Sequence, residues 1–300
     1  MRRKILIVLS ALLCGMALAV IGVGELLSGP VPTAVSTLLT DVAVEPVQIS
    51  RTQWAQSGGV KNDTENEKRP IKGWLLRGVR GRGVILLVHS LRSNRVEMLS
   101  RARFLNEQGY GALLIDLQAH GETYGDEITF GVRESQDIEA AVDYLRNAFP
   151  GERRGAIGVS LGAAAIVLAK NPLGLDAVVL ESLHPTLREA VENRLKLHLG
   201  EFGPILTPLL LWQISPRFGV SPEELDPIRH IGDLNTPVLL ISGTDDRHTT
   251  VPETERLFDA ARQPKELWIV PGGGHFNMHS YAGKEYENRI SDFFHSHLQR

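Results

Sequence analysis

Short apolar runs separated by helical patterns extend from residue 71 to the C-terminus. Residues 84–88 are apolar at every position, which is typical of a strand buried on both faces of a parallel sheet. In residues 133–149 the apolar side chains recur at helical spacing instead. This alternation indicates an α/β fold with a mostly parallel central sheet flanked by helices. We expect strands at 73–76, 84–88, 112–115, 156–159, 177–180, 237–241 and 267–270, and helices at 96–108, 133–149, 161–169, 252–261 and 284–298.

The alternation is interrupted once, between the strand that ends near Glu181 and the strand that begins at Pro237. This interval contains a helical pattern at 187–199 and an apolar stretch at 204–212 that is too short to span a bilayer. The stretch fits either an ordinary packing helix or a lid over a site at the carboxyl edge of the sheet. We predict a helical lid insertion at about residues 184–230, before the penultimate strand.

The longest uncharged segment lies near the N-terminus, where residues 5–23 follow three basic residues. A helix of this length approaches the thickness of a bilayer core, so residues 1–28 are predicted to be a signal anchor or transmembrane segment. The basic residues favour a cytoplasmic N-terminus, which places the rest of the chain outside the cytoplasm. A cleaved signal peptide is the alternative, because Ala17-Leu18-Ala19 has the form of a cleavage site. The product would then be secreted or periplasmic.

Residues 29–41, which begin Gly-Pro-Val-Pro, are predicted to be a linker, and residues 42–300 one catalytic domain. The composition fits this organisation, because 43% hydrophobic and 22% charged residues are ordinary for a globular domain. A net charge of −3 argues against a nucleic-acid partner. The single cysteine, Cys14, excludes an internal disulfide and a cysteine-based metal cluster. We expect neither a metal nor a cofactor.

The clearest chemical motif is Gly-Val-Ser-Leu-Gly at residues 158–162. It follows a predicted strand and opens a predicted helix, which is where a nucleophile elbow lies. Gly158 and Gly162 avoid collisions that side chains would make beside the strained turn at Ser160. The N-terminus of the following helix also directs backbone N–H groups toward the site, where an oxyanion would form.

A serine hydroxyl needs a base to accept its proton and an acid to orient that base. Asp246 follows the predicted strand 237–241, and His275 follows the next strand, so the chain order is Ser160, Asp246, His275. His275 is predicted to be the general base, and Asp246 to set its tautomer. Asp245 is the rival acid, although its position suits a residue that caps the turn. The histidines at 248, 279, 295 and 297 are interpreted as surface residues.

With these motifs, the chain resembles the α/β-hydrolases, most closely bacterial exported or membrane-anchored serine hydrolases of the Bem46-like and serine-aminopeptidase-like branch. The resemblance runs from about residue 42 to the C-terminus and is carried by residues 88–91, 116–123, 158–162, 243–246 and 274–275. It implies that the backbone N–H groups of Leu91 and Leu161 form the oxyanion hole, and it supports Asp246 as the acid. Two positions depart from the family pattern, because Ser90 and Ala119 stand where glycine is usual.

These features together predict a serine hydrolase that cleaves carboxylic esters or related small acyl compounds. A peptidase or amidase, or an acyltransferase, would use the same three residues. A non-catalytic binding protein that kept the fold is the alternative from another class. The expected partners are a small-molecule acyl substrate and, through the N-terminal segment, a membrane.

Overall fold

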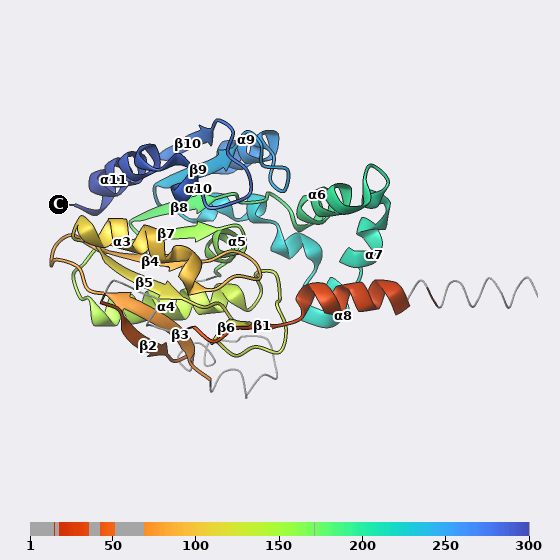
Figure 1. Ribbon diagram of the computed structural model, residues 1–300, viewed down its shortest axis with the longest axis horizontal. Helices are drawn as coiled ribbons and strands as arrows, with labels where there is room; N and C mark the ends of the chain where they lie inside the picture. Colours follow the sequence, from red (N-terminus) through yellow and green to blue (C-terminus); the bar gives the residue numbers. More distant parts are fainter. Residues whose placement is uncertain (1–14, 16–17, 36–42, 52–68, 171, 300) are drawn as a thin grey trace, which may run out of the picture.

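The computed structural model describes residues 15, 18–35, 43–51, 69–170 and 172–299. An eight-stranded sheet forms its centre (Figure 1). The strands are β2 Glu45–Ile49, β3 Ile71–Leu76, β4 Val84–Val88, β5 Gly111–Ile115, β7 Arg154–Val159, β8 Ala177–Glu181, β9 Val238–Gly243 and β10 Lys265–Val270. Their spatial order is β10-β9-β8-β7-β4-β5-β3-β2. The strands from β10 to β5 are parallel, whereas β3 is antiparallel to both of its neighbours, β5 and β2. The predicted fold class is therefore confirmed.

Helices cover both faces of the sheet, because successive strand side chains point to opposite faces. In β4, Leu86 packs into the core on one face, whereas Ile85 and Leu87 pack on the other. The Leu86 face is covered by α4 Glu134–Ala148, α5 Leu161–Val167 and α9 Val251–Ala260. The opposite face is covered by α3 Leu99–Glu107, α10 Met278–Ala282 and α11 Lys284–Leu298, with the short helix η3 Arg95–Met98 before α3.

The helical insertion lies between β8 and β9, as predicted, and projects beyond the carboxyl edge of the sheet (Figure 1). The apolar stretch 204–212 is two short helices, because Pro204 and Pro208 each lie in the first turn of one of them. A proline lacks the N–H that a continuous helix needs, so each one starts a helix more readily than it continues one. The elements are α6 Leu187–Leu199, η4 Gly203–Leu206, α7 Thr207–Leu211, α8 Ile214–Phe218, η5 Pro222–Leu225, η6 Pro227–Arg229 and η7 Ile231–Asp233. We call this insertion the cap.

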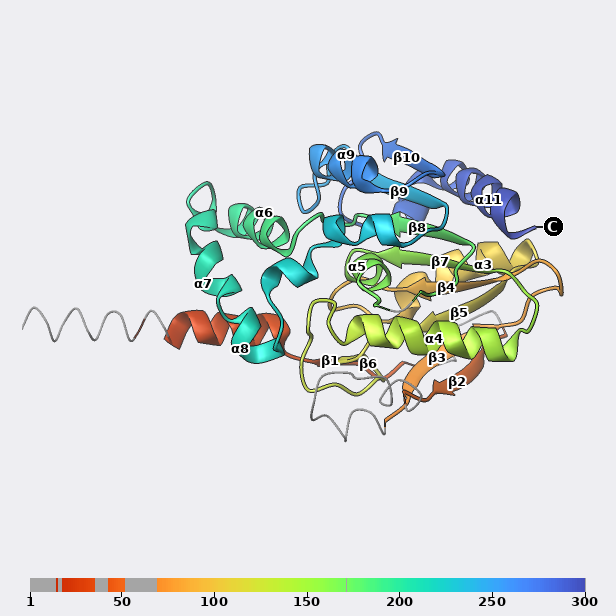
Figure 2. The same ribbon diagram turned by 180° about the vertical axis from the view of Figure 1, so that it is seen from behind.

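Residues 18–28 form a helix that lies beside α8 of the cap (Figures 1 and 2). The Gln213 side chain donates to the Val20 carbonyl at 3.0 Å, and Arg217 donates to Ser28 Oγ at 2.7 Å. These contacts join the end of the predicted targeting segment to the cap. The rest of that segment, residues 1–14 and 16–17, falls outside the described residues. In the ranges that the structure describes, no helix combines the length and the apolar character needed to cross a membrane.

The predicted linker at 29–41 is not a linker at its start. Val31–Pro32 forms β1, which pairs in parallel with β6, His120–Gly121. The Val31 N–H donates to the Ala119 carbonyl at 2.8 Å, so the chain is held against the body of the domain where a linker would be free. Residues 36–42 of the predicted linker and the polar stretch 52–68 lie outside the described residues.

A fully buried ion pair connects α3 to the end of β8. Arg101 of α3 donates two hydrogen bonds to Glu181 at the end of β8, at 2.9 and 2.6 Å. The Tyr286 hydroxyl of α11 also donates to this carboxylate, at 2.6 Å. All three side chains are completely buried, and among the described residues Arg101 is the cation that pairs with Glu181, while Tyr286 adds a hydrogen bond. Removal of either charge would leave the other in a medium that solvates it poorly.

We therefore expect Arg101→Met to lower the free energy of unfolding by about 3–5 kcal/mol, because Glu181 would lose its cation while still buried. Urea unfolding monitored by circular dichroism measures this change. Arg77→Met is the matched control, because Arg77 pairs with Glu45 on the surface, where the two side chains are 65% and 50% exposed. Equal losses from the two variants would contradict a structural role for the buried pair.

Candidate active site

The turn between β7 and α5 holds Ser160 in an unusual backbone conformation. Its φ is +50° and its ψ is −106°, and its N–H donates to the Glu181 carbonyl at 2.9 Å. A Cβ atom at Gly162 would lie 2.5 Å from the Val88 carbonyl oxygen, and one at Gly158 would lie 2.6 Å from the Ala163 nitrogen. Only glycine fits at these two positions. The local structure is that of the nucleophile elbow that the motif predicts.

The loop after β4 brings Leu91 to the same place as Leu161, the first residue of α5. In the described part of the chain, neither backbone N–H donates to another protein group, so both are available to a ligand. The departure from the family pattern at Ser90 has a structural role, because its N–H and hydroxyl both donate to Glu97, at 2.9 and 2.8 Å. Ala119, the other departure, has a φ of +60°, a conformation that glycine adopts more readily.

Asp246 and His275 are in direct contact, with 2.9 Å between Asp246 Oδ2 and His275 Nδ1. The Asp246 side chain is buried and also accepts the Thr249 hydroxyl and two backbone N–H groups. Asp245 is exposed, and its backbone N–H donates to the Gly273 carbonyl in the turn. The structure therefore brings Asp246, and not Asp245, to the histidine. Since Nδ1 contacts the carboxylate, Nε2 is the nitrogen left for a proton from the nucleophile.

The surroundings of Asp246 keep it ionised. Burial alone would raise its pKa, but the hydrogen bond and charge of His275, with the Thr249 donors, lower the pKa of Asp246 to about 2. The carboxylate is thus negative across the pH range in which hydrolases work. A permanent negative charge at Nδ1 stabilises the imidazolium that forms when the base takes up a proton.

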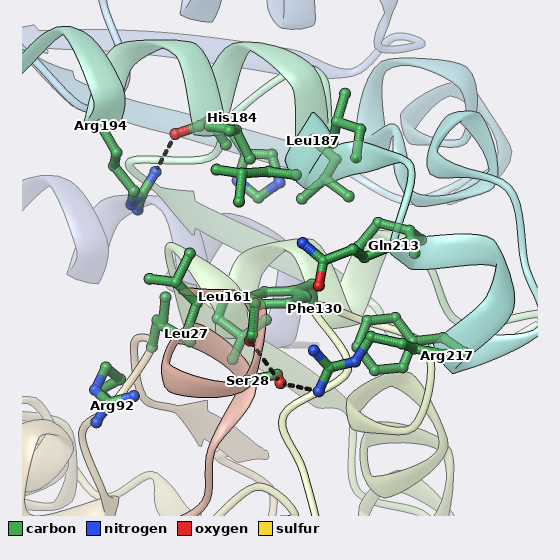
Figure 3. A pocket seen from close by; sticks show the side chains of 18 of the residues that line it. Leu27, Ser28, Arg92, Phe130, Leu161, His184, Leu187, Arg194, Gln213 and Arg217 are labelled. Carbon is green, nitrogen blue, oxygen red and sulfur yellow. Dashed lines mark hydrogen bonds between the residues drawn. The ribbon is translucent and has the colours of Figure 1, made fainter. Parts of the chain in front are cut away.

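A pocket of about 130 Å³ opens at Ser160 (Figure 3). Ser160, Leu91 and Leu161 lie together in its wall, and the cap supplies apolar side chains from α6, α7 and α8. The N-terminal helix 18–28 forms part of the wall through Gly24, Leu27 and Ser28. Most lining side chains are apolar: Leu27, Leu91, Phe130, Leu161, Leu187, Ala190, Val191, Leu210, Leu211, Ile214 and Phe218. The space suits a hydrocarbon chain attached to the reacting carbonyl.

Of the three residues predicted to act together, Asp246 and His275 touch each other, and Ser160 follows β7 at the same carboxyl edge of the sheet. No hydrogen bond joins Ser160 to His275 among the described residues, and this contact is often long in enzymes without bound substrate. Ser160 shares its pocket with His184, whose electrostatic surroundings include His275. The residues thus meet at one edge of the sheet, although the proton-transfer contact itself is not formed.

Sequence analysis missed three contributors to the site. His184 is 7% exposed and lines the pocket, and burial with the charges of Arg194 and His275 lowers its pKa to about 3. His248, interpreted from sequence as a surface residue, is partly buried and its ring lies 4.7 Å from the His275 ring. Burial, followed by the charge of His275, lowers the pKa of His248 to about 4. The third contributor is the helix 18–28.

Comparison with known proteins identifies the family. A model of the alpha/beta hydrolase family matches residues 85–289, and the chain belongs to that family. Among curated proteins, it is 26% identical over 229 residues to the uncharacterized protein YqkD of Bacillus subtilis, covering 74% of each chain. It is 23% identical over 248 residues to the uncharacterized protein YfhR of Escherichia coli, covering 78% of this chain and 80% of YfhR.

Solved structures share the fold. The esterase Pf2001 of Pyrococcus furiosus superposes with a TM-score of 0.70 at 21% identity, covering 90% of this chain and 98% of the esterase. A monoacylglycerol lipase of Paleococcus ferrophilus superposes with a TM-score of 0.56 at 21% identity, covering 76% of this chain and 99% of the lipase. At these identities the likeness shows a common architecture.

The attachment of the N-terminal helix to the cap depends on Arg217, which donates to Ser28 and pairs with Glu25 and Glu127 at 3.1 and 3.3 Å. We expect Arg217→Met to increase hydrogen exchange of the backbone amides in residues 18–28 by about fivefold or more, as expected for a loss of about 1 kcal/mol of local stability. Hydrogen exchange with mass spectrometry measures this rate. Arg256→Met, which removes the cap's pair with Glu189, is the control and should leave the helix protected. Unchanged exchange in Arg217→Met would show that the helix is held by other contacts.

Proposed function

We propose that the protein is a serine hydrolase that cleaves carboxylic esters through Ser160, His275 and Asp246. The observation that carries the proposal is the 2.9 Å contact between Asp246 and His275 at the edge of the sheet where Ser160 occupies its strained turn. The fold is shared with proteins named as esterases and as a monoacylglycerol lipase, which supports the same reaction class here.

In the proposed reaction, Ser160 Oγ attacks the carbonyl carbon of the ester while His275 Nε2 accepts the hydroxyl proton. The negative charge that forms on the carbonyl oxygen is stabilised by the N–H groups of Leu91 and Leu161. His275 then gives its proton to the leaving alcohol, and the acyl group remains on Ser160. A water molecule, deprotonated by His275, attacks this acyl-enzyme, releases the carboxylic acid and restores the serine.

The apolar pocket favours an acyl compound as substrate over a polar peptide. A peptidase or amidase would need donors and acceptors spaced along the peptide backbone, whereas most side chains in this wall are apolar. An acyltransferase would follow the same steps with another acceptor in place of water. We assign the chain to the Bem46-like and serine-aminopeptidase-like branch because of the motifs at 88–91 and 116–123.

We also propose that residues 1–28 direct the catalytic domain out of the cytoplasm, as a retained anchor or as a leader. The proposal rests on the basic start of the chain and the uncharged residues 5–23. The helix 18–28 continues from this run, and Leu18 and Leu26 on it are about 70% exposed, at 70% and 71%. Ile21, Val23 and Leu27 of this helix are exposed as well, and an apolar surface made of several neighbouring side chains fits a segment that lies near lipid.

If Ser160 is the nucleophile, a fluorophosphonate probe should label the purified protein at this residue, because the activated oxygen attacks phosphorus in the same way as a carbonyl carbon. Mass spectrometry of the labelled peptide identifies the site. Ser160→Ala should abolish labelling, whereas Ser296→Ala, a change on the exposed side of α11, should not. An unlabelled wild-type protein would favour the non-catalytic binding reading.

The two neighbouring aspartates should differ sharply in their effect on turnover. Asp246→Asn removes the charge that sets the tautomer of His275, so we expect kcat for p-nitrophenyl esters to fall by about 10³–10⁴. Asp245→Asn alters an exposed turn residue and should change kcat by about twofold or less. The measurement is the initial rate of p-nitrophenol release by each variant, at equal concentrations of folded protein. The opposite ranking would mean that Asp245 orients the base.

A further inference from the structure

A cation lies in the wall of the pocket without a carboxylate to balance it. Arg194 of α6 lines the same cavity as Ser160 and is drawn with its guanidinium extending down from the helix in Figure 3. Its Nη1 donates to the Ala190 carbonyl of its own helix at 2.9 Å. Within the described ranges, no aspartate or glutamate pairs with Arg194, and none lines the pocket. A guanidinium has five N–H donors, so most of its hydrogen-bonding capacity is left for a ligand.

Burial of the Arg194 charge costs free energy unless an anion lies beside it. Arg194 is partly buried among apolar side chains, and burial lowers its pKa, an effect that the more distant charge of Asp246 opposes. An arginine still keeps its proton in proteins, so a full positive charge faces the cavity. The other partly buried arginine of the wall, Arg217, is paired with two glutamates. Arg194 differs from it because no carboxylate of the described residues forms an ion pair with it.

The charge lies on the flank of the pocket that faces His275. Arg194 follows Asn193 in α6, and the Asn193 side chain donates to the His248 carbonyl at 3.2 Å. The His248 ring in turn lies 4.7 Å from the His275 ring. The charge of Arg194 also contributes to the lowered pKa of His184 and of His248. In the reaction proposed above, His275 gives its proton to the leaving alcohol, so the alcohol part of the ester lies on this flank. His184 adds a polar atom there, because its Nε2 is buried with no hydrogen-bond partner in the described structure.

We propose that Arg194 binds an anionic oxyacid group, phosphate or carboxylate, on the alcohol part of the substrate, with the acyl chain in the apolar part of the pocket. This inference rests on the proposed function, because it assigns the two halves of an ester to the two sides of Ser160. The substrate class is then an anionic amphiphile and not a neutral ester. A planar guanidinium suits either oxyacid, because it donates two parallel hydrogen bonds to a pair of oxygens.

The test compares esters that share an octanoyl group and differ in the alcohol. These are octanoyl glycerol, octanoyl glycerol 3-phosphate and octanoyl lactate, which carry no charge, a phosphate and a carboxylate. We expect the wild type to favour at least one anionic ester in kcat/KM by about tenfold or more, the effect of one charged hydrogen bond. The two anionic esters together show which oxyacid is preferred.

Arg194→Met should bring the ratio of anionic to neutral kcat/KM close to one, and Arg194→Lys should retain part of the preference. Arg188→Met is the matched control, because Arg188 lies on the same helix, is 52% exposed and pairs with Glu192 outside the pocket. This control makes the same change in net charge and should keep the wild-type ratio. If Arg194→Met lowers turnover of all three esters by one factor, Arg194 positions the histidine and the inference is wrong.

Binding supplies a readout that does not depend on catalysis. Calorimetric titration compares octyl phosphate with octanol, its neutral partner. We expect the wild type to bind octyl phosphate more tightly, and we expect this difference to be lost in Arg194→Met and kept in Arg188→Met. Equal binding of phosphate and alcohol by the wild type would overturn the inference. Phosphate binding that requires Arg194 in a protein that hydrolyses no ester would support the subsite and contradict the proposed function, so the two failures are distinguishable.

Discussion

The backbone of Ser160 is the constraint around which the site is built. A φ of +50° in a residue with a side chain costs about 1–3 kcal/mol, so the surrounding structure must hold the turn in place. Two close approaches of glycine backbone and one hydrogen bond to the Glu181 carbonyl do this. Glu181 is itself held through its side chain by Arg101 and Tyr286. The buried ion pair therefore helps to fix the residue that accepts the Ser160 N–H, although it does not line the pocket.

The pocket combines parts from three regions of the chain. The sheet edge supplies the serine and the two amides, the cap supplies the apolar wall, and the helix 18–28 completes the wall opposite. The polar groups are not distributed evenly over this surface. Arg194 and His184 lie toward the histidine, whereas aromatic side chains such as Phe130 and Phe218 pack together elsewhere in the wall. Arg92 and Arg217 line other parts of the wall, and Arg217 is paired with two glutamates. The apolar side chains together with Arg194 would orient a substrate before any chemistry occurs.

Local patterns predicted the sheet, most of the helices and the elbow, because these depend on periodicity and on residues adjacent in sequence. The bounds of β4 and α11 agree with the predicted ranges at both ends. The location of Ser160, Asp246 and His275 at one edge of the sheet could also be predicted, because each follows a strand and the carboxyl ends of parallel strands lie at the same edge. The positions of Arg194 and His248 could not be predicted, because the first depends on how the cap folds back over the sheet and the second on how the loops after β9 and β10 pack together. The pairing of Val31 with β6 depends on a contact nearly ninety residues away in sequence, and no local signal marks it.

If residues 1–28 are the anchor or leader proposed above, the helix at 18–28 connects their processing to the shape of the pocket at Ser160. A leader peptidase that cut after Ala19 would leave Val20, whose carbonyl accepts the Gln213 hydrogen bond, as the new first residue. Gly24, Leu27 and Ser28 would all remain in the wall, so a retained anchor and a processed leader lead to the same cavity. A protein trimmed to begin at residue 29 would instead lack Gly24, Leu27 and Ser28, and its pocket would be open on that side. Its selectivity would describe a different enzyme from the one that the cell makes.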